Sequence, residues 1–502
     1  MVRPAEDLRS FVNGNAIRLR AIPVLFLCIL AAGGCSVGPK YVKPTTQIPP
    51  AYKENANWKT AQPSDQWQKG NWWEIFQDQQ LNALEQKVDV SNQSLRAAVD
   101  RYQEARAVLR QTRSSMFPLV TASVSPSQNR QSKNKALFGG TSPVNYSDLV
   151  LEGDVSYEAD VWGAVRKSVA SSRELAQASA ADLETLRLSL HAELALDYMT
   201  LRGLDEQKKL FDSNVEAFEK AVELTESRFR GGVASREDVD LAATQLEQTR
   251  AEDIDITSQR DQFEHAVAVL IGQPASSFGL DPAPSPAIPP VPPPGLPSAL
   301  LERRPDIAGA ERRIASANDQ VGIARAAYFP TITLGLVAGF ESGKFPNWVT
   351  GPSALWSIGA SAAETVFDAG RRRGVSDQAI ASYDEMIADY QQTVLMSFQE
   401  VEDSLSDLRV LEDESKTQDA AVAAANRALD QATNRYKGGL DTYLTVITAQ
   451  SAALENERTA VSLLTRRLTS TVLLVKALGG GWDASQIKDQ QVHPRASQAL
   501  QP

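Results

Sequence analysis

The chain contains almost no cysteine or histidine. Its only two cysteines in 502 residues, Cys28 and Cys35, lie near the N-terminus. The body of the protein therefore has no disulfide framework and no cysteine-ligated metal site. The three histidines, His191, His265 and His493, are too far apart in the sequence to show metal-ligand spacing. No Ser/His/Asp constellation or phosphate loop stands out, so the sequence predicts no enzymatic activity and no cofactor.

The chain has an excess of negative charge, and long apolar runs are scarce. The formal net charge is −11 at pH 7, so the chain has no general electrostatic attraction to nucleic acid, and no nucleic-acid partner is expected. After residue 34, no apolar run reaches the length of about 18 residues that a membrane helix requires. If the protein crosses a membrane, it must therefore do so with β-strands.

Residues 1–34 have the pattern of a signal peptide. Two arginines precede an apolar run over residues 21–32, which is too short to span a bilayer. The small residues before Cys35 resemble a bacterial lipobox, in which the cysteine receives a covalent lipid and becomes the new N-terminus. Ala32 departs from the usual leucine, and Ser36 after the cysteine implies sorting to the outer membrane. The alternative is ordinary secretion with cleavage elsewhere.

The rest of the sequence repeats itself in three places, in the same order and at nearly constant spacing. Such an arrangement indicates the duplication of one unit of about 200 residues. Between the two halves, residues 281–297 contain nine prolines, which predicts an extended linker without regular structure. The matching segments are 113–118 and 325–330, 162–166 and 367–371, and 228–233 and 435–440.

Proline is absent from residues 144–273 and 353–493. Because proline in a helix interior costs about 3 kcal/mol, its absence permits very long helices. Leucines recur at three- and four-residue steps in the first of these stretches, which is typical of a helix with one apolar seam. We expect helices over residues 164–229 and 371–436, each about 100 Å long. Gly203 weakens the first of them by about 1 kcal/mol relative to alanine.

The segments before these helices have the two-residue period of β-strands. Apolar residues alternate with polar or acidic ones over residues 119–125 and 149–160 in the first half. The pattern returns over residues 332–340 and, less cleanly, over 356–362. One apolar face suits a transmembrane barrel, although a periplasmic sheet sandwich would show the same alternation. Four strands cannot close a barrel, for which about eight are needed, so several chains would have to share one.

The predicted fold is therefore mainly α with a small β part and an internal duplication. Each repeat is expected to contain a helix, a β-hairpin and a pair of long helices joined by a turn. The predicted boundaries are a signal peptide at 1–34, a lipidated extension at 35–70, a first repeat at 71–280 (hairpin about 117–161, turn 231–235), a linker at 281–299, a second repeat at 300–482 (hairpin about 329–367, turn 438–442) and a polar tail at 483–502.

The sequence contains the segment 300–307 (LLERRPDI), Ala310, Glu311 and Ala317, the segments 321–330 and 476–482, and the start of the mature chain at 34–41. These motifs resemble those of the TolC/OprM family of outer-membrane efflux channels. The lipoprotein start is similar to the OprM-type, NodT-type branch. The resemblance implies a homotrimer with a 12-stranded β-barrel in the outer membrane, four strands per chain, on a periplasmic α-helical barrel.

The resemblance also implies that the protein transports substrates and catalyses no reaction. The trimer would conduct substrates passively from an inner-membrane pump, usually of the RND type, and a periplasmic adaptor protein. Drugs, solvents and metals are all candidate substrates. A structural or adhesive coiled-coil lipoprotein without a pore is the alternative, and membrane conductance separates the two.

The reversals of the two long helices are candidate contact sites. Glycine permits the left-handed backbone that a helix C-terminus commonly needs, and a serine can cap the returning helix. The same residues would serve as purely structural turns. The resemblance adds that they form the periplasmic tip that adaptor hairpins contact. The residues assigned to this tip are Gly231, Gly232, Val233, Ser235, Gly438, Gly439 and Leu440.

The resemblance further implies a gate at the tip, where carboxylates constrict a cation-preferring pore. Asp238 matches one such position, and Tyr436 matches a tyrosine that helps to hold the closed state. Asp441 stands where TolC has arginine, so an Asp–Arg clasp cannot form as in TolC. The negative charges of Asp441 and Asp238 would instead lie at the same tip and repel each other. Thr445 and Thr448 stand where TolC-like chains carry aspartate. Helix capping is the competing role for Asp238.

Overall fold

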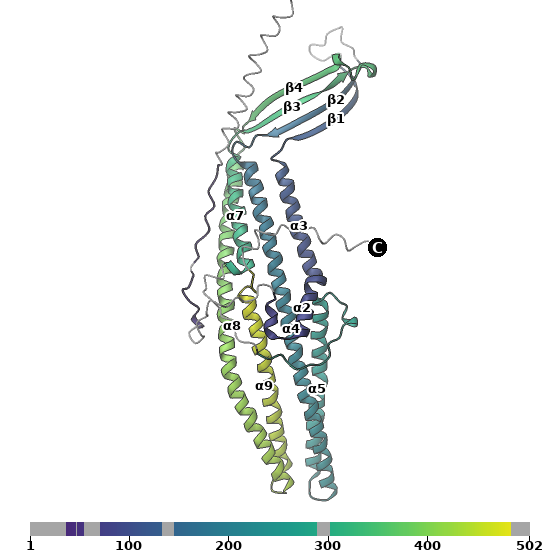
Figure 1. Cartoon of the computed structure of the whole chain (residues 1–502), viewed down its shortest axis with the longest axis vertical. Helices are drawn as coiled ribbons and strands as arrows, with labels where there is room; N and C mark the ends of the chain where they lie inside the picture. The colour runs from purple at the N-terminus through teal and green to yellow at the C-terminus, as the bar shows by residue number, and fades with distance from the viewer. Residues whose placement is uncertain (1–36, 47, 55–70, 133–144, 289–301, 483–502) are drawn as a thin grey trace, which may run out of the picture. The chain divides into compact units, whose positions relative to one another are not determined.

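The structure is a computed structural model that describes residues 37–46, 48–54, 71–132, 145–288 and 302–482. The described chain is mainly helical, with one four-stranded sheet (Figure 1). Across these ranges, no helix combines the length and the apolar character needed to cross a membrane. The main elements are α2 (Gln79–Ser91), α3 (Gln93–Ser114), β1 (Leu119–Arg130), β2 (Asn145–Glu158), α4 (Ala164–Arg230), α5 (Arg236–Leu270), α7 (Pro305–Ala326), β3 (Thr331–Ser342), β4 (Ala354–Ala363), α8 (Arg371–Lys437) and α9 (Tyr443–Ala477).

The four strands form one antiparallel sheet in the order β1-β2-β3-β4. Its central pair joins the two halves of the chain, with Gly153 of β2 opposite Ala338 of β3. A Cβ atom at Gly339 would lie 2.1 Å from the carbonyl oxygen of Leu151, so these two strands can approach closely only because residue 339 is glycine. Within the described sheet, β1 and β4 each pair on one side only, which leaves two open edges.

The predicted long helices are confirmed, and they show how regular the duplication is. Helices α4 and α8 have 67 residues each, and α5 and α9 have 35 residues each. All four helix boundaries of the second half lie 207 residues after those of the first half: 371 − 164, 437 − 230, 443 − 236 and 477 − 270 all equal 207. Residues separated by 207 are therefore structural equivalents along these helices.

An aspartate three or four residues before each long helix accepts hydrogen bonds from the start of that helix. Asp160 accepts from the backbone N–H groups of Val165 and Arg166, at 3.0 and 2.9 Å. Asp368 accepts from the backbone of Arg372 and also forms an ion pair with its side chain at 2.8 Å. Such carboxylates satisfy free N–H groups and lie near the positive end of the helix dipole.

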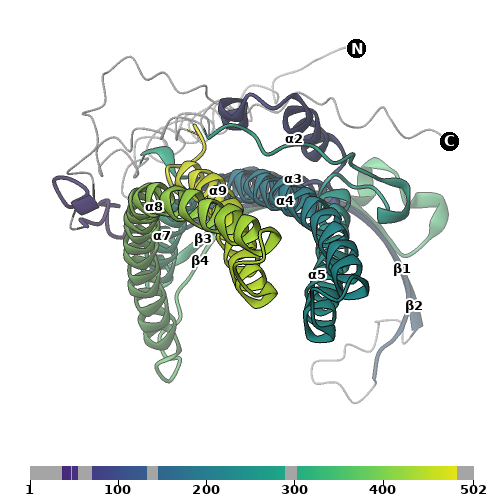
Figure 2. The same cartoon turned by 90° about the horizontal axis from the view of Figure 1, so that it is seen from below.

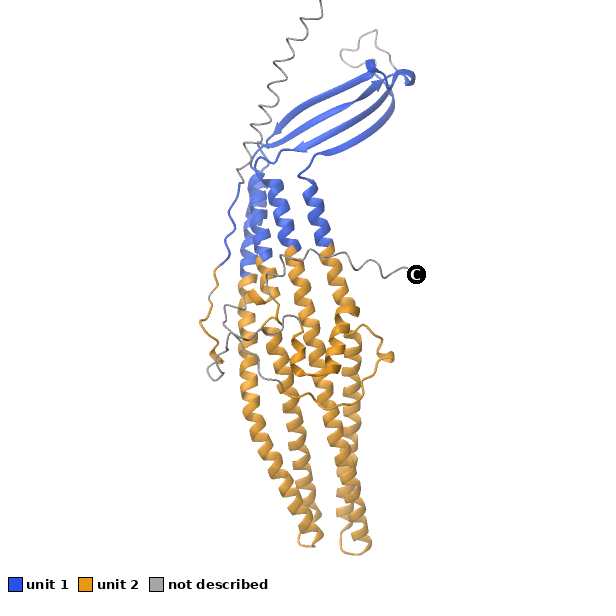
Figure 3. Cartoon of the chain, viewed as in Figure 1, with its two compact units in different colours: residues 1–44, 104–176, 312–388 blue, residues 45–103, 177–311, 389–502 orange. Residues whose placement is uncertain are grey.

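The chain divides into two compact units, and each unit contains parts of both repeats (Figure 3). One unit, blue in Figure 3, comprises residues 1–44, 104–176 and 312–388 and includes the sheet. Inside it, Trp162 stacks on Phe329 with ring centroids 4.7 Å apart, and its Nε1 donates to the carbonyl oxygen of Pro330 at 2.8 Å. Motifs that recur in the two halves thus pack against each other.

The other unit contains the main apolar core. Trp72, Trp73 and Phe76 are buried there against leucines of α2 and α4. A buried polar contact joins the same two helices, because Nδ1 of His191 on α4 lies 2.6 Å from Oε2 of Glu85 on α2. The ring of His191 also stacks on Trp73, with centroids 4.5 Å apart.

The described part of the predicted motif, residues 302–307, has a structural role in the same unit. Arg304 is buried just before α7 and forms an ion pair with Asp306 at 2.7 Å. Its guanidinium also pairs with Glu400 of α8 at 2.6 Å and donates to the carbonyl oxygen of Ala477 at the end of α9. One arginine therefore fixes the start of α7 to both helices of the second pair.

Candidate functional site

The first helix reversal ends α4 with a pattern of backbone hydrogen bonds known as the Schellman motif. The N–H of Val233 donates to the carbonyl oxygen of Arg228 at 2.9 Å, and the N–H of Gly232 donates to that of Phe229. Gly232 has a φ of 73°, in the left-handed region, whereas Gly231 does not. A Cβ at Gly232 would meet no atom within 4 Å, so glycine is needed here for its conformation and not for space.

The second reversal repeats this geometry 207 residues later. The N–H of Leu440 donates to the carbonyl oxygen of Arg435 at 2.9 Å, and Gly439 has a φ of 71°. Both turns carry apolar side chains into solvent: Val233 is 67% exposed and Leu440 is 75% exposed. The residues assigned to the tip thus present two equivalent turns, each with an exposed aliphatic side chain next to a left-handed glycine.

Asp238 takes part in a helix cap at the start of α5. The backbone N–H of Asp238 donates to Oγ of Ser235 at 3.1 Å, and Oδ2 of Asp238 accepts from the backbone N–H of Ser235 at 3.0 Å. These reciprocal bonds form a capping box. One oxygen of the carboxylate is therefore occupied by the helix cap. Burial is the main cause that raises the pKa of the Tyr436 and Tyr443 phenols, and the negative charge of Asp238 raises both pKa values further.

Asp441 is satisfied within its own turn. It accepts from the backbone N–H of Thr442 and from Oγ1 of Thr445, both at 2.9 Å, and lies 3.2 Å from Nε of Arg435. These hydrogen bonds, led by that of Thr442, and the charge of Arg435 hold the pKa of Asp441 below its usual range. The carboxylate is therefore ionised and has a partner, which reduces any repulsion with Asp238.

Arg228 links the two long helix pairs at the tip, a role that sequence reasoning missed. Its guanidinium carbon lies 4.7 Å from the centre of the Tyr436 ring, and Nη1 donates to the carbonyl oxygen of Lys437 at 3.3 Å. Tyr436 is only 4% exposed and also packs on Tyr443, with ring centroids 5.1 Å apart. Arg435 is the equivalent of Arg228 in the second repeat, but it bonds to Asp441 within its own turn. The repeat pattern alone could not show that only Arg228 contacts the other helix pair.

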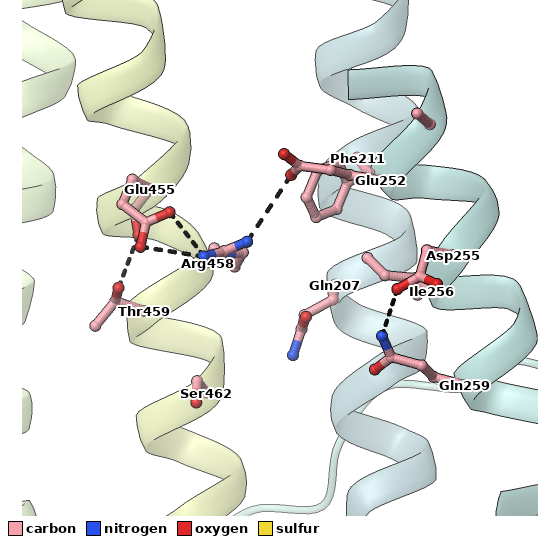
Figure 4. A pocket seen from close by; sticks show the side chains of 11 residues that line it. Gln207, Phe211, Glu252, Asp255, Ile256, Gln259, Glu455, Arg458, Thr459 and Ser462 are labelled. Carbon is pink, nitrogen blue, oxygen red and sulfur yellow. Dashed lines mark hydrogen bonds and ion pairs between the residues drawn. The ribbon is translucent and has the colours of Figure 1, made fainter. Parts of the chain in front are cut away.

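The two helix pairs also touch along α5 and α9, which lie side by side in Figure 2. Oγ of Ser451 donates to Oε1 of Gln245 at 3.1 Å, and one heptad further along, Arg458 faces Glu252 at 3.8 Å. A third close approach occurs between α4 and α9, where a Cβ at Gly203 would lie 2.1 Å from Oγ1 of Thr465. Apolar contacts join the pairs as well, since Leu454 of α9 belongs to the same buried cluster as Phe211 of α4 and Ile256 of α5 (the last two are labelled in Figure 4).

Cys35 lies outside the described residues, but part of the segment that follows it is fixed to α8. The backbone N–H groups of Lys53 and Glu54 donate to the two carboxylate oxygens of Glu402, at 2.7 and 3.0 Å. Glu54 also forms an ion pair with Arg409 at 2.7 Å. The equivalent arginine of the first repeat, Arg202, donates to the carbonyl oxygen of Asp281 in the linker at 2.9 Å. Equivalent arginines therefore hold two different extended segments.

The chain combines one four-stranded sheet with two pairs of long helices, α4 with α5 and α8 with α9. This is the architecture of an outer-membrane efflux channel subunit. The comparisons with known proteins agree with this class. Residues 84–273 and 296–480 match the outer membrane efflux protein family, one match in each half. The chain belongs to this family, and it is an outer-membrane channel component of an efflux system.

Relatives and solved structures of this kind cover most of the chain. It is 30% identical to the pyoverdine export outer membrane protein OpmQ of Pseudomonas aeruginosa, over 83% of this chain and 88% of that protein. It is also 30% identical to the outer membrane protein OprJ of the same species, over 91% and 95% of the two chains. The structure of the outer-membrane channel OprN covers 89% of this chain and 100% of its own, with a TM-score of 0.83 and 31% identity.

Proposed function

We propose that three copies of this chain assemble into one channel, with the four strands of each copy closing a shared 12-stranded barrel. The observation that carries this proposal is the sheet itself, because β1 and β4 each leave an unpaired edge. Open edges are not tolerated in lipid, and four strands are too few to close alone. Exposed apolar side chains on both edge strands support the proposal, among them Val120, Val124, Trp356 and Ile358.

The channel passively conducts substrates delivered by an inner-membrane pump of the RND type and a periplasmic adaptor. Recording in planar bilayers tests this directly. Purified protein is expected to give discrete ion conductance and to migrate as a trimer on unheated gels. Trimers without conductance would leave a structural lipoprotein as the better description, and a monomeric protein in detergent and lipid would contradict the shared barrel.

The two turns at 231–235 and 438–442 are the proposed contact site for the adaptor. Their exposed Val233 and Leu440 offer an apolar surface at two equivalent places. The double variant Val233→Asn/Leu440→Asn is expected to reduce adaptor crosslinking and to raise drug sensitivity, while trimers persist. Val269→Asn is the matched control, since Val269 is 69% exposed at the other end of α5.

Glycine variants test the same turns in a second way. Gly232→Leu and Gly439→Leu place a bulky side chain on a left-handed backbone and are expected to distort the turns and weaken efflux. Gly231→Ala is the matched control, because Gly231 is not left-handed and a Cβ there would make only ordinary contacts, the nearest at 3.5 Å. Normal efflux in the Asn double variant and in both Leu variants would rule out these turns as the adaptor contact.

A further inference from the structure

One repeated motif of the sequence is not explained by the channel architecture. Residues 113–118 and 325–330, which are 212 residues apart (325 − 113 = 212), span the end of the helix that precedes each hairpin. In both copies, the backbone N–H three residues after the arginine donates to the carbonyl oxygen of that arginine, at 3.1 and 3.2 Å. A proline then closes each copy, and the strand begins at the next residue. We call these two segments the foot motifs, because they lie where β1 and β3 begin.

Both foot motifs lie at the same end of the sheet, within the unit that contains it (Figure 3). Strands β1 and β3 are each antiparallel to β2, so they run in the same direction, about 10 Å apart, and begin at the same end. Each arginine comes four residues, or about 6 Å of helix, before a phenylalanine. Each foot motif therefore places a positive charge about one helical turn further from the strand than its aromatic side chains.

The aromatic side chains of the foot motifs are exposed. Phe117 is 64% exposed, Tyr328 is 42% exposed and Phe329 is 38% exposed. Such apolar surface costs free energy in water, whereas girdles of aromatic residues flank the apolar band of membrane barrels. With the strands in the outer membrane, these rings lie at its boundary, and the arginines lie at the level of the lipid headgroups.

The arginines of the foot motifs are exposed and have no partner. Neither Arg113 nor Arg325 makes an ion pair or a side-chain hydrogen bond in the part of the chain that the structure describes. Within the same described ranges, Arg371 at the start of α8 adds a third unpaired positive charge, against the unpaired carboxylate of Glu158. The chain as a whole has a net charge of −11, yet this end of the sheet carries a local positive excess that attracts anions. Other basic residues here already have partners: Arg166 pairs with Asp160, Lys167 with Asp319 and Arg372 with Asp368.

The segment that follows Cys35 reaches the same end of the sheet. The backbone N–H of Val37 donates to the carbonyl oxygen of Trp162, just before α4, at 3.1 Å. Nδ2 of Asn318 on α7 donates to the carbonyl oxygen of Pro39 at 3.3 Å. Val37 comes two residues after Cys35 in the sequence, so a lipid on that cysteine would enter the bilayer close to the foot motifs.

We propose that the foot motifs bind the anionic phospholipid headgroups of the leaflet that holds the Cys35 lipid. The guanidinium of each arginine meets a phosphate, and the exposed rings beside it lie at the boundary with the acyl chains. A zwitterionic phospholipid brings its own positive charge, so it competes poorly for an unpaired arginine. An arginine at a helix C-terminus also complements the helix dipole, but that role leaves the exposed rings unexplained. This binding rests on the proposed function, which puts the sheet in the membrane.

Native mass spectrometry measures this lipid preference directly. The mature protein, purified in detergent, is incubated with equal amounts of phosphatidylglycerol and phosphatidylcholine that have identical acyl chains. We expect about fivefold more phosphatidylglycerol to be retained, as for one arginine near an anionic membrane surface. Arg113→Gln/Arg325→Gln is expected to bring the ratio of retained lipids to about one, because both unpaired charges are lost. Arg113→Lys/Arg325→Lys should keep most of the preference, because the positive charge remains.

Arg96→Gln/Arg101→Gln is the matched control, since both arginines are exposed on α3. Arg101 precedes Arg113 by 12 residues (113 − 101 = 12), or about 18 Å of helix, which exceeds the screening length of about 8 Å at physiological salt. The lipid ratio should therefore change less than about twofold in this variant. Phe117→Asn should lower the retention of both lipids and leave their ratio unchanged, because it removes apolar contact and no charge. If Arg113→Gln/Arg325→Gln is not recovered folded, Arg113→Gln alone carries the test, with an expected ratio of about three.

Three outcomes would overturn the proposal. Equal retention of the two lipids by native trimers that conduct ions would remove the lipid site and leave the channel. A ratio that stays high in Arg113→Gln/Arg325→Gln would place the bound lipid elsewhere, and a lower unfolding midpoint or fewer trimers would then assign the arginines to helix ends or to contacts between copies. Loss of the preference in excess glycerol phosphate would describe a site for soluble phosphate esters. A chain that stays monomeric but retains phosphatidylglycerol through these arginines would contradict the shared barrel alone.

Discussion

The guanidinium carbon of Arg228 lies 4.7 Å from the centre of the Tyr436 ring. This contact joins the end of α4 to the end of α8, which are 207 residues apart in the chain. A cation above an aromatic face is worth about 0.5–1 kcal/mol at a partly exposed site. Where a channel opens by separation of these helix ends, such a contact favours the closed arrangement.

The first prediction concerns this contact. Arg228→Gln is expected to increase the open fraction of single channels about fivefold, which corresponds to a loss of about 1 kcal/mol. Arg435→Gln is the matched control, because the equivalent arginine bonds to Asp441 within its own turn. Tyr436→Phe should largely keep the contact, since it retains the aromatic face that Arg228 lies above. Equal open fractions in Arg228→Gln and Arg435→Gln would contradict a special role for Arg228.

The second prediction separates the two roles of Asp238. Asp238→Asn keeps an oxygen that can accept from Ser235 but removes the charge, so the cap remains. Ser235→Ala keeps the charge but removes the cap, at a cost of about 1 kcal/mol of local stability. A gate carboxylate predicts lower cation selectivity and weaker divalent-cation block in Asp238→Asn only, measured by single-channel recording. Unchanged selectivity and block in that variant would leave capping as the sole role.

Local sequence signals predicted the elements, and tertiary contacts decided the roles of particular residues. Proline-free stretches and two-residue alternation indicated the long helices and the strands, because both signals act over neighbouring residues. Glycine pairs indicated the turns for the same reason. The contacts of Arg228 and Arg304 bring together residues about 200 and 100 positions apart, which no local pattern encodes.

The third prediction concerns Gly203, whose long-range contact could not be predicted from the local sequence either. The sequence alone marks it as a weak point of α4, whereas the structure places it against Thr465 of α9. Gly203→Ala should destabilise the protein by about 1–2 kcal/mol, because overpacking costs roughly 1–3 kcal/mol and exceeds the gain in helix propensity. Thermal unfolding monitored by circular dichroism measures the effect.

Two companion variants make this prediction specific. Gly374→Ala in α8 should be neutral or slightly stabilising, since a Cβ there meets no atom within 4 Å. Gly203→Ala/Thr465→Ala should recover most of the lost stability if the clash lies between these two residues. A stable single variant would show that α4 and α9 can separate here at no cost.

The fourth prediction concerns the anchor at Cys35. Cys35→Ser is expected to abolish lipid attachment while the proposed trimers still form, because the burial expected in a shared barrel and its helices far exceeds the contribution of one anchor. Mass spectrometry of the mature N-terminus measures the modification, and unheated gels measure assembly. An unmodified peptide that contains residues 34–36 in the native protein would show that secretion uses another cleavage site.

The last prediction concerns the buried pair between His191 and Glu85. Burial alone would lower the pKa of His191, but hydrogen bonds with Asp89 and Glu85 outweigh it and raise the pKa to about 9. A pKa that is higher in the folded state means that the charged imidazole contributes stability below its unfolded value of 6.5, and that this contribution is lost as pH rises through about 9. Burial, the larger cause, raises the pKa of Glu85 above its ordinary value, and the hydrogen bond and charge of His191 oppose this rise.

His191→Gln should therefore destabilise the protein by about 3 kcal/mol near pH 6.5, as expected when one partner of a buried ion pair is removed. The difference from the native sequence should shrink as pH is raised from 6.5 to 9, because the unfolded histidine is already neutral there and the folded one loses its charge by about pH 9. His265→Gln, at an exposed position of α5, is the control and should be neutral throughout. Unfolding midpoints across this range decide the matter: a constant difference would mean that His191 acts through its stacking on Trp73 and not through its charge.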